Sequence, residues 1–220
     1  LGLESTPDEY VASMVAVFAE VWRVLADDGT LWLNLGDSYS GSGKGPAGNI
    51  GAKHDERNME HVHSAIIPEG LKAKDLVGIP WRVAFALQAD GWYLRQDIIW
   101  HKPNPMPESV KDRCTKSHEY VFLLSKKPKY FFDSKAIREP QSPATIADIG
   151  RRKEMNNKSD FGGVRPDLGR NRHDYVPADG MRNKRDVWSI ATKPFKGAHF
   201  AVMPEALVEP CVLAGSKVGD

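Results

Sequence analysis

The chain has 220 residues, of which 41% are hydrophobic and 27% are charged, and its formal net charge at pH 7 is +1. This size and composition indicate one globular domain with room for an insertion. No apolar run approaches the ~20 residues of a membrane span and no signal peptide is seen, so we expect no membrane partner. The two cysteines lie far apart with no motif around them, which favours a reducing compartment such as the cytoplasm. Neither they nor the seven histidines have the spacing of metal ligands, so we expect no metal site.

The first predicted helix lies within "STPDEYVASMVAVFAEVWRVLADDG". Thr6 suits the N-cap, Pro7 the first helical position, and Glu9 completes a capping box. Apolar residues at helical spacing predict a core-facing side: Tyr10, Met14, Val17, Val21 and Leu25, with Phe18 and Trp22 beside them. Asp28-Gly29 ends the helix.

The stretch "TLWLNL" follows as a strand with little polar interruption, which is typical of a central strand covered on both faces. The glycine-rich stretch after it does not fit a phosphate-binding loop, because Ser38 and Gly45 stand where Gly and Ser or Thr are needed. Residues 40–70 are predicted to form a mobile loop. Asp37, at the carboxyl end of the strand, either faces a ligand site or caps a turn.

Further helices and strands alternate along the rest of the chain. A helix is predicted from Pro80 to Ala89, followed by a strand in "WYLRQDIIW". The stretches "EYVFLLS" and "KYFFD" are predicted to pair as a hairpin that turns at Lys127-Pro128. A strand in "DVWSI" and a helix starting near Pro204 come last. This alternation predicts an open α/β sheet.

The run "DIIWHKPNPMPES" takes an apolar strand directly into three prolines, at positions 103, 105 and 107. Proline fixes φ and cannot donate a hydrogen bond to a sheet, so the loop that follows the strand is stiff. Loops at strand ends are where functional sites are built, although a strand that only needs a sharp stop would look the same. The run alone leaves both interpretations open.

Charge is distributed unevenly. Residues 1–50 carry two basic and seven acidic side chains, whereas residues 138–187 carry eleven basic ones, eight of them arginine. An arginine-rich, glycine-punctuated and apolar-poor segment fits a nucleic-acid-reading insertion. Composition alone favours an ordinary solvated excursion.

Three blocks of the chain resemble the bacterial and phage DNA amino-methyltransferases. They begin at "LGLESTPDEY", "GIPWRVAFALQ" and "HFAVMPEALVEP", in the order of the permuted branch, where the target-base half precedes the cofactor half. The resemblance implies methyl transfer from S-adenosylmethionine to the exocyclic amine of cytosine (N4, favoured) or adenine (N6) in double-stranded DNA. It also implies a Rossmann-like methyltransferase fold of the α/β class. A homodimer and a cognate restriction endonuclease are further partners that it allows.

The resemblance divides the chain into a target-base half at 1–137, a target-recognition insertion at 138–187 and the start of the cofactor half at 188–220. It places the proline loop by the active site, where Trp100 either stacks on the base or packs in the core. Lys102 is expected to contact a phosphate or another side chain. The implied site residues are Asp37, Trp100, His101, Lys102 and Asn104. Glu119 is expected to orient Arg113 or a nearby backbone amide.

The same resemblance implies residues for the other two ligands. For S-adenosylmethionine they are His199, Phe200, Ala201, Pro204 and Glu205, at the start of the last helix. For DNA they are Arg165, Arg170, Arg172, Arg182 and Arg185.

Two motifs of the family do not occur in this sequence. The chain has no Pro-Pro-aromatic catalytic motif and no Phe-x-Gly-x-Gly cofactor loop. We therefore expect a fragment cut between the two motifs, with an incomplete sheet, an unprotected sheet edge and no activity of its own. The alternative is a non-catalytic DNA-binding module that keeps a methyltransferase scaffold.

Overall fold

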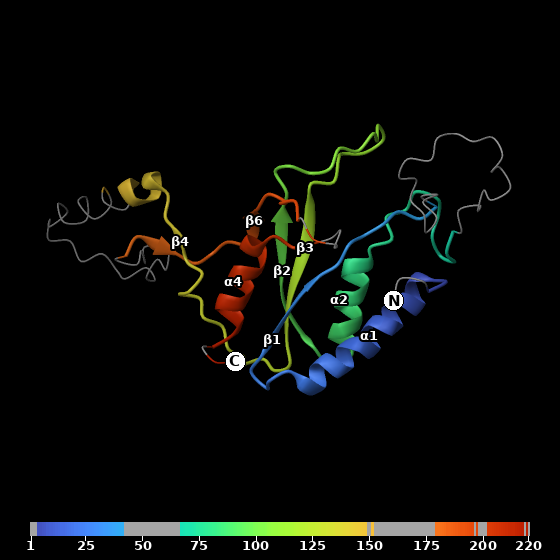
Figure 1. Cartoon of the computed structure of the whole chain (residues 1–220), viewed down its shortest axis with the longest axis horizontal. Helices are drawn as coiled ribbons and strands as arrows, with labels where there is room; N and C mark the ends of the chain where they lie inside the picture. The colour runs from blue at the N-terminus through green and yellow to red at the C-terminus, as the bar shows by residue number, and fades with distance from the viewer. Residues whose placement is uncertain are drawn as a thin grey trace, which may run out of the picture. The chain divides into compact units, whose positions relative to one another are not determined.

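The computed structural model describes residues 4–41, 67–148, 151, 179–195, 197, 202–217 and 219 (Figure 1). Most of the predicted loop at 40–70 lies outside these residues. The chain divides into two compact units, the first formed by Leu1–Phe131 with Asp186–Leu207 and the second by Phe132–Arg185 with Val208–Asp220. In the described ranges, no helix has the length and apolar character needed to cross a membrane.

The first unit is built on a four-stranded sheet with the strand order β1-β3-β2-β6. Its strands are β1 (Thr30–Asn34), β2 (Tyr93–His101), β3 (His118–Ser125) and β6 (Val187–Ser189). Since β3 pairs antiparallel with both β1 and β2, and β6 pairs parallel with β2, strands β1, β2 and β6 share one direction. Their carboxyl ends therefore meet at one edge of the sheet. Together with its helices, this sheet confirms the predicted α/β class.

Two strand predictions were wrong. The stretch "KYFFD" forms no strand, and β3 forms its hairpin with β2, in register from Tyr93 opposite Ser125 to His101 opposite His118. The proline-rich run is thus the connection of this hairpin. The second error concerns β1, which its apolar sequence predicted to be a central strand. Among the described strands β1 lies at the edge of the sheet, and β3 is central.

Helix α1 (Pro7–Val24) begins as the sequence predicts. The Thr6 hydroxyl accepts a hydrogen bond from the Glu9 N–H at 3.2 Å, and the Glu9 carboxylate accepts one from the Thr6 N–H at 3.3 Å. The predicted core-facing side needs a correction at Val17, which is 42% exposed, while Phe18 is buried with Met14. Both Val17 and Phe18 fit helical spacing between Met14 and Val21, and packing in the core is what buries Phe18.

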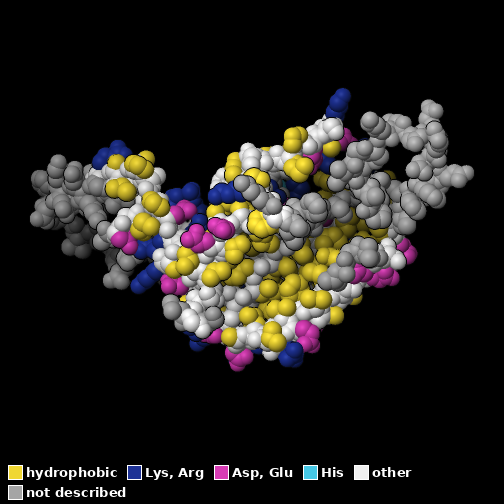
Figure 2. All heavy atoms as spheres, viewed as in Figure 1, with side chains coloured by type: hydrophobic (Ala, Val, Ile, Leu, Met, Phe, Trp, Pro, Cys, Tyr) yellow, Lys and Arg dark blue, Asp and Glu magenta, His cyan; other side chains and the backbone are white. Residues whose placement is uncertain are grey.

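Helix α2 (Ile79–Ala89) follows Gly78, whose φ of 76° lies in the left-handed region that glycine adopts without strain. The hydrophobic core forms where α1 and α2 pack on β1 and β3. Its buried members are Met14, Phe18, Leu33, Val83, Ala84, Leu87, Trp92, Phe122 and Leu124. Hydrophobic side chains also gather on the surface over the region of β1 and α2 in Figure 2.

The second unit contains a two-stranded sheet of β4 (Glu139–Pro140) and β5 (Met181–Arg182). Helix α4 (Glu205–Gly215) begins in the first unit and ends in the second, where the Asp133 N–H donates to the Ala214 carbonyl at 2.9 Å. Burial raises the pKa of the Cys211 thiol to about 12. The predicted insertion at 138–187 stays a prediction, since compactness does not identify a recognition region.

The corrected face of α1 can be tested by two neighbouring substitutions. Phe18→Ala should lower the free energy of unfolding by about 3–5 kcal/mol, because it removes a buried aromatic ring and leaves a cavity. Val17→Ala should cost about 0.5 kcal/mol or less, since its side chain is partly exposed. Urea denaturation of both variants decides between the two faces, and a larger loss for Val17→Ala would restore the face predicted from sequence.

Candidate functional site

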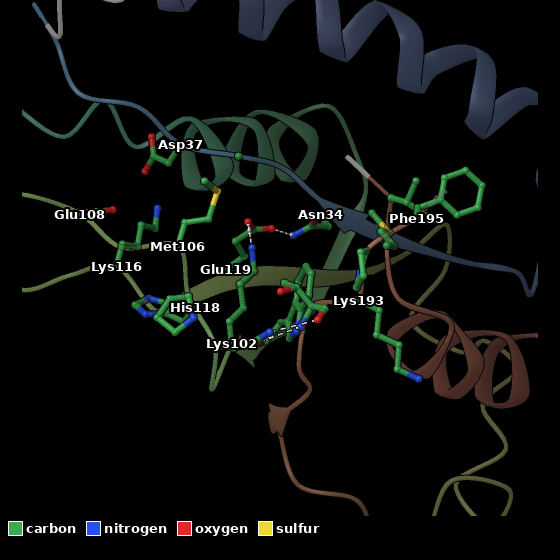
Figure 3. Close-up of a pocket in the computed structure, with 18 of the residues that line it drawn as sticks. Asn34, Asp37, Lys102, Met106, Glu108, Lys116, His118, Glu119, Lys193 and Phe195 are labelled. Carbon is green, nitrogen blue, oxygen red and sulfur yellow. Dashed lines mark hydrogen bonds and ion pairs between the residues drawn. The ribbon is translucent and has the colours of Figure 1, made fainter. Parts of the chain in front are cut away.

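A pocket of about 760 Å³ opens at the edge of the sheet where β1, β2 and β6 end (Figure 3). Its lining comes from the end of β1, from β2 and the hairpin loop, from the start of β3, and from the segments after β6 and before α4. Residues that line it include Asn34, Asp37, Trp100, Lys102, Asn104, Met106, Lys116, His118, Glu119, Thr192 and Met203. In open α/β sheets, ligands bind at the carboxyl ends of strands. The pocket therefore lies where the topology predicts a ligand site.

Glu119 connects three segments of the pocket wall. One of its carboxylate oxygens accepts a hydrogen bond from the Lys102 ammonium, and the other accepts one from the Asn34 amide at 3.1 Å. The Lys102 and Glu119 side chains are only 19% and 26% exposed. Asn34 also donates to the Tyr120 carbonyl at 2.8 Å. This network joins β1, β3 and the residue that follows β2.

The partner expected for Glu119, Arg113 or a nearby backbone amide, was wrong. Arg113 pairs with Glu108 at 3.0 Å, and its guanidinium lies over the Tyr39 ring at 4.1 Å. The signal for the true partner was available only indirectly. Lys102 follows β2 and Glu119 lies near the start of β3, so a hairpin between these strands brings them together.

Trp100 is 4% exposed, which supports the packing interpretation of this residue. Its indole N–H donates to the Ile190 carbonyl at 2.8 Å. The Lys102 ammonium lies 4.3 Å from the centre of its ring. The ring borders the pocket, but little of its surface is open to a ligand.

His101 and Asn104 connect β2 and its loop to the segment around β6. The His101 Nδ1 lies 3.0 Å from the Ser189 hydroxyl, and His101 is not among the residues that line the pocket. Asn104 makes two hydrogen bonds with the backbone of Thr192, accepting from its N–H at 3.0 Å and donating to its carbonyl at 3.2 Å. Both side chains thus hold the wall of the pocket in place.

Asp37 caps helix α2 and also borders the pocket (Figure 3). Its Oδ1 accepts hydrogen bonds from the N–H groups of Gly78 at 2.9 Å and Ile79 at 3.0 Å, as well as from Ser38. The two interpretations of Asp37 left open by the sequence are therefore compatible. A carboxylate at a helix N-terminus is favoured by the free N–H groups there.

The hairpin loop is held at several points besides its prolines. The Lys102 N–H donates to the Ser117 carbonyl at 2.7 Å where the loop closes. Further along, the Lys74 ammonium donates to Asp112 at 2.8 Å, and this hydrogen bond holds the pKa of the Asp112 carboxyl below its ordinary value. This ion pair is exposed, so it joins the loop to the segment that precedes α2 but contributes little stability.

The cofactor residues expected from the resemblance are only partly described. His199, Phe200 and Ala201 lie outside the described residues, while Pro204 is buried and Glu205 is exposed at the start of α4. Val202 and Met203, just before this helix, line the pocket. In the described part of the chain, no group of three or more His, Cys, Asp or Glu could hold a metal ion.

Two of the five candidate DNA-binding arginines are described, and both contact one carboxylate. Arg182 and Arg185 donate through Nε to the same Glu139 oxygen at 2.9 and 2.7 Å. Burial would raise the pKa of Glu139, but the hydrogen bonds and charges of the two arginines outweigh it and hold the pKa below its ordinary value. Arg165, Arg170 and Arg172 lie outside the described residues.

The fold and the pocket define an α/β protein with a candidate ligand pocket at the carboxyl edge of its sheet. Comparison with protein families matches residues 1–220 to the model described as DNA methylase. The chain belongs to this family, which confirms the resemblance seen in the sequence and supports the Rossmann-like fold that it implied.

Curated relatives agree with this assignment. The chain is 45% identical to Type II methyltransferase M.Cfr9I of Citrobacter freundii and 46% identical to M.XycI of Xanthomonas campestris pv. cyanopsidis, in each case over 100% of this chain. It is 45% identical to M.SmaI of Serratia marcescens. The chain spans 61% of the length of the first two relatives and 63% of the third.

The Lys102–Glu119 pair can be measured with a double-mutant cycle. Lys102→Met alone should destabilise the protein by roughly 1–3 kcal/mol, because it leaves a largely buried carboxylate without its charged partner. Glu119→Gln alone should cost a similar amount. The double variant should lose less than the sum of the two single losses, as measured by urea denaturation. Strictly additive losses would show that the pair contributes no coupling.

Proposed function

We propose that the protein is a DNA amino-methyltransferase and that this chain builds its target-base site. The complete protein would transfer a methyl group from S-adenosylmethionine to the N4 amine of cytosine, or to the N6 amine of adenine. The observation that carries the proposal is the family match over residues 1–220, together with relatives that are named Type II methyltransferases. Restriction-modification is the corresponding biological role, with a cognate endonuclease as one partner and a homodimer as a further proposal.

The chemistry of the pocket suits this reaction. An exocyclic base amine is a poor nucleophile, so the base must leave the stack and be held while acceptors face its N–H bonds. Asp37 and Asn34 bring oxygen acceptors to the pocket, while the Lys102 ammonium is paired with Glu119. The Glu119 carboxylate thus neutralises the Lys102 ammonium, which would otherwise repel the positive charge that develops on the base amine. We therefore assign Lys102, His101, Asn104 and Trp100 to the support of the site.

The start of α4 offers backbone groups to the methionine end of S-adenosylmethionine. The first N–H groups of a helix have no partner within the helix and favour a carboxylate. Glu205 in this first turn is exposed, so its own charge can remain in water. Together with His199, Phe200 and Ala201, these residues would hold one end of the cofactor. The bound cofactor supplies the methyl group.

The proposal is tested by methyl transfer with tritiated S-adenosylmethionine and duplex DNA, using the full-length protein and the 220-residue chain side by side. The full-length protein should label DNA, and mass spectrometry of the digested DNA should show N4-methylcytosine. The 220-residue chain should bind S-adenosylmethionine no better than about millimolar and transfer no methyl group, because it lacks the cofactor loop. A full-length protein that binds duplex DNA and never labels it would establish the non-catalytic alternative.

DNA reading by residues 138–187 makes a separate prediction. Replacing Arg170 and Arg172 by glutamine should weaken duplex binding and reduce the slope of log affinity against log salt by about 0.9 for each lost phosphate contact. An arginine that reads a base should add roughly 1–3 kcal/mol of discrimination.

Fluorescence anisotropy at several salt concentrations measures both effects. A matched control, Arg23→Gln with Lys129→Gln, removes the same charge from exposed positions of the first unit. Equal salt slopes for the two double variants would show that only net charge matters and would refute a reading role for Arg170 and Arg172.

A further inference from the structure

Met106 is an exposed apolar side chain at the pocket. It is 85% exposed, the largest exposed fraction among the large hydrophobic residues described in this structure. Figure 3 shows it reaching from the hairpin loop into the pocket. Because Met106 lines the pocket, its apolar surface is open to a ligand that enters there.

The backbone around Met106 is held in place before any ligand arrives. Pro105 and Pro107 have fixed φ angles on either side of it. Asn104, next to Pro105, makes two hydrogen bonds with the Thr192 backbone. A ligand therefore does not have to order this loop on binding, which reduces the entropic cost of the contact.

Trp100 cannot readily supply the apolar contact that a base needs. Its ring is buried, and one face is covered by the Lys102 ammonium. Phe195 also lines the pocket, but its neighbours at 196 and 198–201 lie outside the described residues. Val202 and Met203 line the pocket as well, but Met106 is the more exposed side chain and lies on the loop that the prolines stiffen.

We propose that Met106 packs against the face of the target base once the base has left the duplex. This inference rests on the proposed function. A nucleobase presents a π face and a polar edge, and the pocket offers a thioether beside polar groups of Asn34, Asp37 and His118. Sulfur contacts with aromatic rings are favourable, and an unbranched methionine side chain adapts to a ring that enters and leaves. Met106 is thus assigned to base binding, and Trp100 to the support of the loop.

The experiment uses the full-length protein and a duplex built around the site that the wild-type protein methylates. A second duplex carries an abasic nucleotide at the target position, so that the base face is missing. Met106→Ala should bind the normal duplex about three- to tenfold more weakly than wild type. It should bind the abasic duplex within about twofold of wild type, because no base is present to contact.

Two further variants complete the test. Met106→Leu keeps the apolar contact and should recover most of the lost affinity, whereas Val24→Ala, at an exposed position of α1, should match wild type on both duplexes. The melting temperature of Met106→Ala should equal that of wild type, since the side chain is exposed.

The inference is overturned by wild-type affinity of Met106→Ala for the normal duplex. An equal loss on the normal and abasic duplexes also overturns it, since the contact would then be to another part of the DNA or to the loop. A Met106→Leu variant as weak as Met106→Ala counts against an apolar contact as well. Failure of the proposed function is a different result, namely a wild-type protein that methylates no duplex.

Discussion

The carboxylate of Glu119 is the interaction on which the pocket depends. A largely buried charge is costly unless it is paired and hydrogen-bonded, and here one oxygen meets the Lys102 ammonium and the other the Asn34 amide. Glu119 lies on the central strand β3, while its partners stand at the ends of the neighbouring strands β2 and β1. The two hydrogen bonds of the Glu119 carboxylate therefore hold together the ends of β1, β2 and β3, from which the pocket wall extends.

The hairpin loop between β2 and β3 is rigid. The loop leaves the sheet at Lys102 and returns near Ser117, where a 2.7 Å backbone hydrogen bond closes it. Its three prolines remove backbone freedom that would otherwise have to be lost when a ligand binds. A site held on such a loop can keep its geometry within the narrow limits that binding and catalysis require. The conformational entropy of the loop is therefore lost during folding and not during ligand binding.

Most local signals were read correctly from the sequence, with the strand in "KYFFD" as an exception, and contacts distant along the chain were not. The capping box at Thr6 and Glu9, helix α2 and the strand in "DVWSI" each depend on neighbouring residues, and each was predicted. The hairpin partner of β3 and the partner of Glu119 depend on pairing across a long loop, which proline spacing does not specify. Val17 was misassigned because helical spacing defines a stripe without fixing its edges. Packing alone decides which neighbour is buried.

The arginines of the second unit show why composition is a weak guide to a recognition surface. Arg182 and Arg185 meet at one oxygen of Glu139 on the β4–β5 sheet, so part of their charge stabilises that sheet. Two guanidiniums and one carboxylate still leave one positive charge, so the contact with Glu139 does not cancel the charge of the pair. Bidentate reading of guanine takes two donors of one guanidinium, so a structural contact through Nε and a role in DNA binding are compatible. A count of arginines therefore does not give the positive charge that the second unit presents to a ligand, because each contact with a carboxylate offsets part of it.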